Sequence, residues 1–92
     1  MKPVVLVTHP IYPSALEAIR RDYDALMLFD ASEPDVLISQ EGHRVRAIAG
    51  GDVSAELMDR LPNLEIIANF GVGYDSVDIA SAKARGIIVT HT

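Results

Sequence analysis

Short apolar runs alternate along the chain with segments in which apolar residues recur at helical spacing. The runs have the length of strands and lie at 4–8, 25–29, 45–49, 64–68 and 87–90. The first is almost entirely branched aliphatic, as expected of a strand buried on both faces of a parallel sheet. This alternation is typical of repeated βαβ units. We therefore expect an α/β fold with a flavodoxin-like, doubly wound parallel sheet of about five strands in the order 2-1-3-4-5.

Capping and turn residues mark the helices between these strands. Side chains that can accept a hydrogen bond from a helical N–H precede three segments of helical period. These caps and their expected helices are Ser14 for 15–22, Ser54 for 55–61 and Asp78 for 79–85. Pro34 suits a first helical turn, so a short helix is expected over 33–40, ending near Gly42. Gly86 is expected to form the C-terminal turn of the last helix.

Length, charge and composition narrow the class of protein. The 92 residues suffice for one domain, 1–92, and 49% hydrophobic with 23% charged residues is typical of a globular chain. A net charge of −5 argues against nucleic acid or an anionic membrane as a partner. Without cysteine there is no disulfide and no thiolate metal site. No apolar stretch approaches the roughly 20 residues that span a bilayer, so a cytoplasmic setting is expected.

The most informative segment is the glycine-containing turn N-F-G-V-G-Y-D-S-V-D at 69–78, which follows the apolar run 64–68. Glycines allow a tight turn and a close approach of another molecule, and exposed N–H groups after a strand can hold a small anion. An ordinary strand-to-helix turn is the alternative. The turn lacks the third glycine of a dinucleotide fingerprint, because residue 76 is Ser76, so a nucleotide site is not predicted.

The expected strand order brings three loops to one edge of the sheet. They are residues 8–13, 50–52 and 71–75, and ligands of such sheets bind at the carboxyl ends of the strands. None of the three histidines has metal-ligand spacing, so no metal site is predicted; they are His9, His43 and His91. Asp75 and Asp78 are interpreted as turn and cap residues rather than as paired catalytic acids.

The last third of the chain resembles a known family. L-P-N-L-E-I-I-A-N-F-G-V-G-Y-D-S-V-D followed by A-K-A-R-G-I-I-V-T-H-T is similar to the N-terminal substrate-binding domain of the D-isomer-specific 2-hydroxyacid dehydrogenases. The members most similar to it are described as glyoxylate/hydroxypyruvate or hydroxyphenylpyruvate reductases. The resemblance implies an NAD(P)-dependent oxidoreductase that interconverts 2-oxo acids and D-2-hydroxy acids. The first two thirds match only in their βα pattern.

Transferred by position, the resemblance assigns substrate-binding residues to this chain. The amides of Val72 and Gly73, in the turn that begins at Gly71, would bind the substrate carboxylate. Gly50 and Gly51 would line the opposite side and leave room for a substrate side chain.

The resemblance also implies what this chain lacks. The family's catalytic arginine, glutamate and histidine, and the loop that binds NAD or NADP, lie in a nucleotide-binding domain and a returning segment that nothing here matches. We therefore expect no catalytic residue, no cofactor site and no turnover in this chain, as a fragment of a homodimeric parent that binds a small 2-oxo acid. The alternative is a stand-alone module of the same fold that binds a small anion or another protein.

Overall fold

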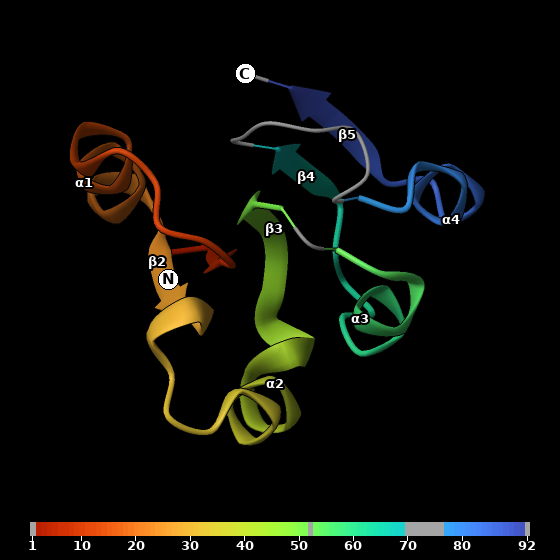
Figure 1. Ribbon diagram of the computed structural model, residues 1–92, viewed down its shortest axis with the longest axis horizontal. Helices are drawn as coiled ribbons and strands as arrows, with labels where there is room; N and C mark the ends of the chain where they lie inside the picture. Colours follow the sequence, from red (N-terminus) through yellow and green to blue (C-terminus); the bar gives the residue numbers. More distant parts are fainter. Residues whose placement is uncertain (1, 52, 70–76, 92) are drawn as a thin grey trace.

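A five-stranded, fully parallel sheet forms the centre of the protein (Figure 1). The computed structural model describes residues 2–51, 53–69 and 77–91. The strand order is β2-β1-β3-β4-β5, which confirms the expected flavodoxin-like topology. The strands are β1 (Val4–Val7), β2 (Asp24–Met27), β3 (Val45–Gly50), β4 (Ile66–Asn69) and β5 (Ile88–His91).

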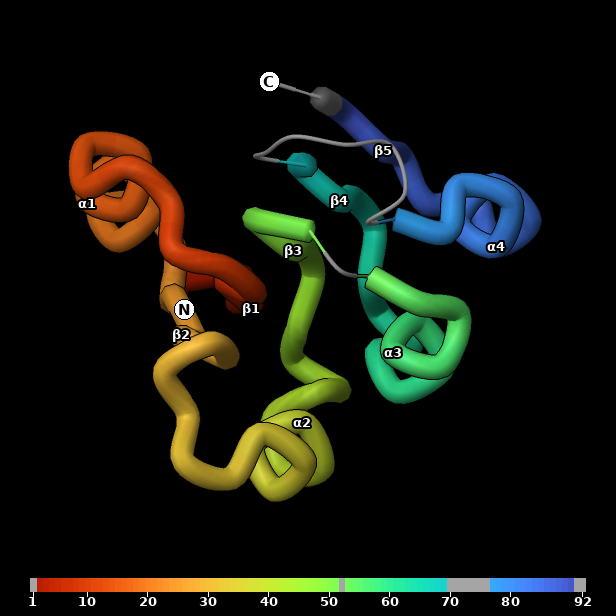
Figure 2. The backbone as a smooth tube through the Cα atoms, viewed as in Figure 1, coloured from red at the N-terminus to blue at the C-terminus, as the bar shows by residue number. Residues whose placement is uncertain are grey.

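The described helices lie on both faces of the sheet, but unequally. They are α1 (Pro13–Asp22), α2 (Pro34–Glu41), α3 (Ala55–Asp59) and α4 (Ile79–Ala84), with short 3-10 helices at Leu28–Asp30 and Gly42–Arg44. The backbone trace shows α1 on one side of the sheet and the other three α-helices on the opposite side (Figure 2). The βαβ pattern read from the sequence is therefore confirmed.

Two of the three expected caps are present. The Ser54 hydroxyl accepts a hydrogen bond from the Leu57 N–H at 3.2 Å, and the Asp78 carboxylate accepts one from the Ser81 N–H at 3.1 Å. Gly86 has φ +74° and ends α4 in the left-handed conformation that favours glycine. These local signals therefore fix where α3 begins and where α4 begins and ends.

The expectation for Ser14 was wrong. Helix α1 begins at Pro13, and its N-cap residue Tyr12 makes no side-chain cap hydrogen bond. Proline has a locked φ that suits the first helical position, so the helix begins before Ser14 and places that residue inside the first turn. The second strand also ends early, at Met27, because the chain turns into the 3-10 helix Leu28–Asp30. The remaining boundaries lie within two residues of those expected.

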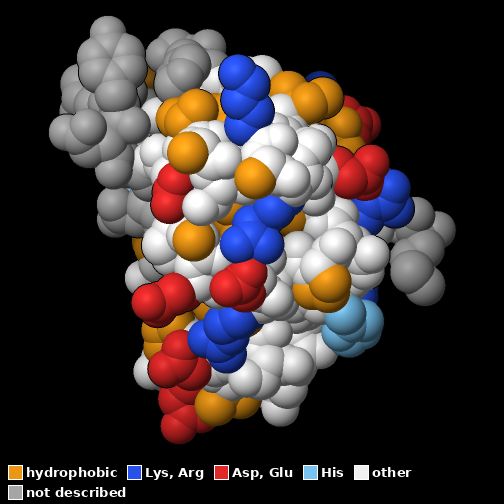
Figure 3. Space-filling model, turned by 90° about the vertical axis from the view of Figure 1, so that its right-hand side faces the viewer, with side chains coloured by type: hydrophobic (Ala, Val, Ile, Leu, Met, Phe, Trp, Pro, Cys, Tyr) orange, Lys and Arg blue, Asp and Glu red, His pale blue; other side chains and the backbone are white. Residues whose placement is uncertain are grey.

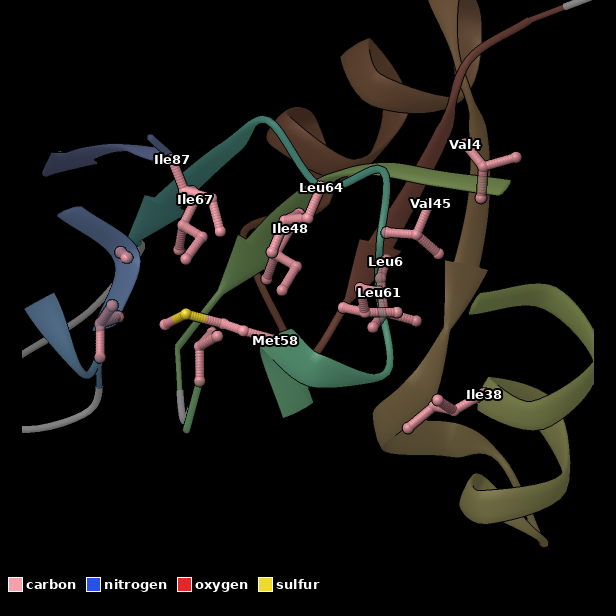
Figure 4. Packing of buried hydrophobic residues seen from close by; sticks show 13 residues of the cluster. Val4, Leu6, Ile38, Val45, Ile48, Met58, Leu61, Leu64, Ile67 and Ile87 are labelled. Carbon is pink, nitrogen blue, oxygen red and sulfur yellow. The ribbon is translucent and has the colours of Figure 1, made fainter. Parts of the chain in front are cut away.

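The hydrophobic core fills the space between the sheet and helices α2 to α4. Alternate strand residues face opposite sides of a sheet, and Leu6, Ile48 and Ile67 face this side, each with at most 1% of its surface exposed. They belong to one buried cluster with helix and loop residues Ile38, Met58, Leu61 and Ala82 (Figure 4). Burying side chains of this size is the main favourable term in folding.

The opposite face of the sheet becomes progressively more exposed from β1 toward β5. Val5 and Val7 are buried, whereas Ile66 is half-buried and its neighbour across the ladder, Ile88, is 61% exposed. Within the described ranges, α1 alone packs on this side. A shallow depression of ≈ 330 Å³ is left there, lined mainly by Val5, Ile19, Tyr23, Ala47, Ala49, Ile66 and Ala68.

The outer surface of helices α2 to α4 carries ion pairs rather than a patch of one charge. Arg60, after α3, pairs with Asp35 of α2 at 3.0 Å, and Arg85, after α4, pairs with Asp59 of α3 at 2.7 Å. Acidic and basic side chains are interspersed over the face shown in Figure 3. Among the described residues, no helix is long and apolar enough to cross a membrane.

Candidate functional site

The carboxyl ends of β1, β3 and β4 lie side by side, because these strands are neighbours in the sheet. The loops that follow them therefore leave from one edge, as the strand order predicts. The loop after β1 is bound at its start to the end of β3, since the Thr8 N–H donates to the Ala49 carbonyl at 3.0 Å. A site built from these loops would lie at this edge.

Thr8 connects the end of β1 to the loop after β3 through its side chain. Its hydroxyl donates to the Gly51 carbonyl at 2.7 Å and accepts from the Gly51 N–H at 2.9 Å. Only 9% of Thr8 is exposed, so these bonds are formed away from bulk water. Both backbone polar groups of Gly51 are thus engaged by one hydroxyl. The Gly51 N–H is therefore not directed at a ligand in this conformation.

Gly50 makes this contact possible. Its φ is +133°, a conformation that side chains rarely adopt, and it is buried. A Cβ at this position would lie 2.3 Å from the Thr8 hydroxyl oxygen and 3.0 Å from the backbone nitrogen of His9. The space that a Cβ of residue 50 would occupy is therefore filled by the Thr8 hydroxyl.

The end of β4 is tied to the same loop. Asn69 is buried and lies opposite Gly50 in the β3–β4 ladder. Further along, Val53 pairs with Val77 in a parallel bridge, and the Asp78 N–H donates to the Val53 carbonyl at 2.9 Å. The segment after β3 therefore contacts the chain on both sides of residues 70–76.

The predicted carboxylate-binding residues Gly71, Val72 and Gly73 lie outside the described residues, as do Asp52 and Asp75. Their assignment stays a prediction, as does the lining role of Gly50 and Gly51. The structure brings the last two together with Thr8, a residue that the sequence indicated only as part of a loop. A hydroxyl residue directly after an apolar strand, matched by a Gly-Gly pair after another, is the signal that could have identified it.

The described part of this edge presents backbone and hydroxyl groups. His9 follows Thr8 and is half-buried. In residues 2–51, 53–69 and 77–91, no group of three or more His, Asp or Glu side chains could hold a metal ion. The carboxylate of Glu65 raises the pKa of Arg46, by a hydrogen bond first and by its charge second, but this exposed pair lies near the amino ends of β3 and β4.

Comparison with known sequences gives a consistent result. Residues 5–92 match the family described as D-isomer specific 2-hydroxyacid dehydrogenase, catalytic domain. The chain is 35% identical over 96 residues to the glyoxylate reductase of Thermococcus litoralis, covering 100% of this chain and 29% of that protein. It is 32% identical to a glyoxylate/hydroxypyruvate reductase of Arabidopsis thaliana, covering 96% of this chain and 29% of the relative.

Solved structures show the same likeness. A 2-hydroxyacid dehydrogenase from Ketogulonicigenium vulgare superposes with a TM-score of 0.85 at 38% identity, over 96% of this chain and 29% of the other. An NADPH-dependent glyoxylate/hydroxypyruvate reductase from Sinorhizobium meliloti, solved with NADP and malonate, gives 0.82 at 41% identity, over 100% and 28%. The chain thus spans less than a third of the length of these relatives. With its fold and nearly its whole length matched, the chain belongs to the D-isomer specific 2-hydroxyacid dehydrogenase family.

Proposed function

We propose that this chain supplies the carboxylate-binding part of an NAD(P)-dependent enzyme that reduces a small 2-oxo acid, of the glyoxylate or hydroxypyruvate type, to a D-2-hydroxy acid. One observation carries the proposal: the loops after β1 and β3 are joined beside the end of β4, in a chain that matches the family's catalytic domain over residues 5–92. The relatives named as glyoxylate reductases support the choice of substrate class.

In this proposal the chain binds and orients the substrate. The backbone amides of Val72 and Gly73 donate to the carboxylate, and Gly50 and Gly51 form a neutral wall opposite them. Backbone amides hold an anion without a mobile side chain, so little entropy is lost when the substrate binds. A fixed carboxylate in turn sets the position of the adjacent keto carbon, which is the atom that must be reduced.

The residues present do not fit the dinucleotide itself. The turn carries Ser76 where a dinucleotide loop needs its third glycine, and the pattern G-x-G-x-x-G occurs nowhere else in this sequence. Reduction requires a hydride donor and a proton donor, and we assign neither to these residues. We therefore expect the 92-residue chain alone to oxidise no NAD(P)H in the presence of glyoxylate.

Substrate binding can be tested on the chain alone by nuclear magnetic resonance titration with malonate. Malonamide is the matched control, because it has the same skeleton without the carboxylates. We expect malonate, but not malonamide, to shift the amide resonances of Gly51 and Asn69, which flank the proposed site. Val72→Pro removes one proposed amide donor and should weaken binding, whereas Val72→Ala keeps that N–H and should not.

Catalytic competence can be tested with a chimera. The matching segment of the Thermococcus litoralis glyoxylate reductase is replaced by this chain, and NAD(P)H oxidation with glyoxylate is followed. Turnover by the chimera together with none by the isolated chain is the expected result. Two results together would contradict the proposal. The chimera would fold but be inactive, and malonate would not change the amide chemical shifts of the isolated chain.

A further inference from the structure

We propose that Thr8 is a positioning residue for carboxylate binding at this edge, because its hydroxyl holds the loop after β3 in the conformation that receives the ligand. This inference rests on the proposed function and concerns a residue that does not itself touch the substrate. The chain separation of the contact, 43 residues, means that Thr8 joins two loops that only the folded sheet brings together.

The Thr8 hydroxyl pairs with both backbone polar groups of Gly51. One buried hydroxyl satisfies both the N–H and the C=O of Gly51, at 2.9 and 2.7 Å. Without that hydroxyl both groups would be left buried and unpaired, a costly arrangement in a protein interior. The loop would then move to expose Gly51 to water. The hydroxyl therefore selects one loop conformation among several that the backbone could adopt.

Threonine at position 8 and glycine at position 50 suit this contact. A β-branched side chain has few χ1 rotamers, so the hydroxyl is held in place before Gly51 contacts it. The Thr8 hydroxyl can reach the Gly51 backbone because Gly50 lacks a Cβ, which would lie 2.3 Å from the hydroxyl oxygen. Gly50, with φ +133°, and Thr8 are therefore complementary in shape. A glycine needed only for the turn would not require a hydroxyl residue beside it.

The loop after β3 is also connected to the segment before α4. The same loop continues to Val53, which pairs with Val77 and accepts a hydrogen bond from the Asp78 N–H at 2.9 Å. A displacement at Gly51 is therefore passed on to the start of the segment that leads into α4. When the loop at Gly50 and Gly51 is already ordered before the ligand binds, less conformational entropy is lost on binding. Removal of the Thr8 hydroxyl should therefore weaken affinity for the carboxylate.

The experiment compares malonate affinities of variants of the chain by nuclear magnetic resonance titration. Thr8→Val is nearly isosteric and removes only the hydroxyl; we expect it to bind malonate about tenfold more weakly. Thr8→Ser restores the hydroxyl and should bind within about threefold of the wild type. Asn63→Ala is the stability control, because it removes a hydrogen bond from the loop before β4 to the His43 carbonyl in the 3-10 helix before β3, and it should leave malonate affinity unchanged.

A measurement on the wild type avoids the risk that Thr8→Val does not fold. If the locked loop is the binding conformation, bound malonate must in turn stabilise it, because coupling between two equilibria is reciprocal. Saturating malonate should therefore slow hydrogen exchange of the Gly51 N–H. Exchange at Gly86 should stay the same, because that residue lies between α4 and the start of β5 and not in the loops after β1 and β3.

The outcomes separate this inference from the proposed function. A wild-type chain that does not bind malonate removes the proposed function, and this inference with it. A wild-type chain that binds, with Thr8→Val equal in affinity or with Gly51 exchange unaffected by malonate, overturns the role of Thr8 alone. Weaker binding by Thr8→Val that Thr8→Ser restores supports it.

Discussion

Gly50→Ala should be far more damaging than the same substitution at Gly86, although both glycines have positive φ. At Gly50, with φ +133°, the new Cβ would lie 2.3 Å from the Thr8 oxygen, so Thr8 must move and give up its hydrogen bonds to Gly51. At Gly86, with φ +74°, nothing lies within 4 Å of the Cβ position. The pair thus separates the cost of backbone strain from the cost of breaking the contact.

The expected magnitudes follow from these contacts. Backbone strain at Gly50 costs about 1–3 kcal/mol, and loss of two buried hydrogen bonds adds about 1–3 kcal/mol. We therefore expect Gly50→Ala to lower the free energy of unfolding by about 2–6 kcal/mol. Gly86→Ala carries about 1–2 kcal/mol of strain, offset by about 0.4–1 kcal/mol because alanine has fewer unfolded conformations. Its net cost should be about 1.6 kcal/mol or less.

Urea unfolding followed by far-ultraviolet circular dichroism measures the difference. With an m value of about 1 kcal/mol per molar for a small domain, Gly50→Ala should lower the unfolding midpoint by about 2 M or more. Gly86→Ala should lower it by about 1.6 M at most. Equal midpoints for the two variants would refute the reasoning, because they would mean that the Thr8 contact adds nothing to backbone strain.

Four further substitutions test other parts of the fold by the same urea assay. Ile67→Ala opens a cavity at a fully buried position and should cost about 2–5 kcal/mol; a loss below about 1 kcal/mol would contradict the core assignment. Asp78→Ala removes the α4 cap and should cost about 0.5–2 kcal/mol, whereas Ser14→Ala, at a residue that caps nothing, should change stability by less than about 0.5 kcal/mol. Arg60→Ala breaks a surface pair with Asp35, whose side chain is 93% exposed, and should cost about 1 kcal/mol or less, with a smaller effect in high salt.

The fold could be predicted from the sequence because its signals are local. The branched aliphatic run at 4–8 and the helical spacing after it define βα units, and a parallel sheet follows from joining such units. Boundaries were less certain where two signals compete, as at Pro13 and Ser14. Both residues favour a helix start, and the locked φ of proline decided it.

The site was predictable in outline but not in its contacts. Strand order alone places the loops after β1 and β3 at one edge, so the neighbourhood of Gly50 and Gly51 could be expected. The bond between Thr8 and Gly51 could not, because it joins residues 43 positions apart and depends on the register of β1 against β3. A glycine also has several uses, and only the position of the Thr8 hydroxyl shows that Gly50 serves close packing.

The sheet face beside α1, with Ile88 61% exposed, also governs how the domain responds to its surroundings. The m value of unfolding scales with the surface newly exposed, so apolar area already in water in the native state adds nothing to it. Any molecule or segment that covers this face binds the folded state and not the unfolded chain. By mass action its presence raises the free energy of unfolding in proportion to the logarithm of its concentration once the face is occupied. The stability of this domain therefore depends on the concentration of whatever binds this face as well as on its sequence.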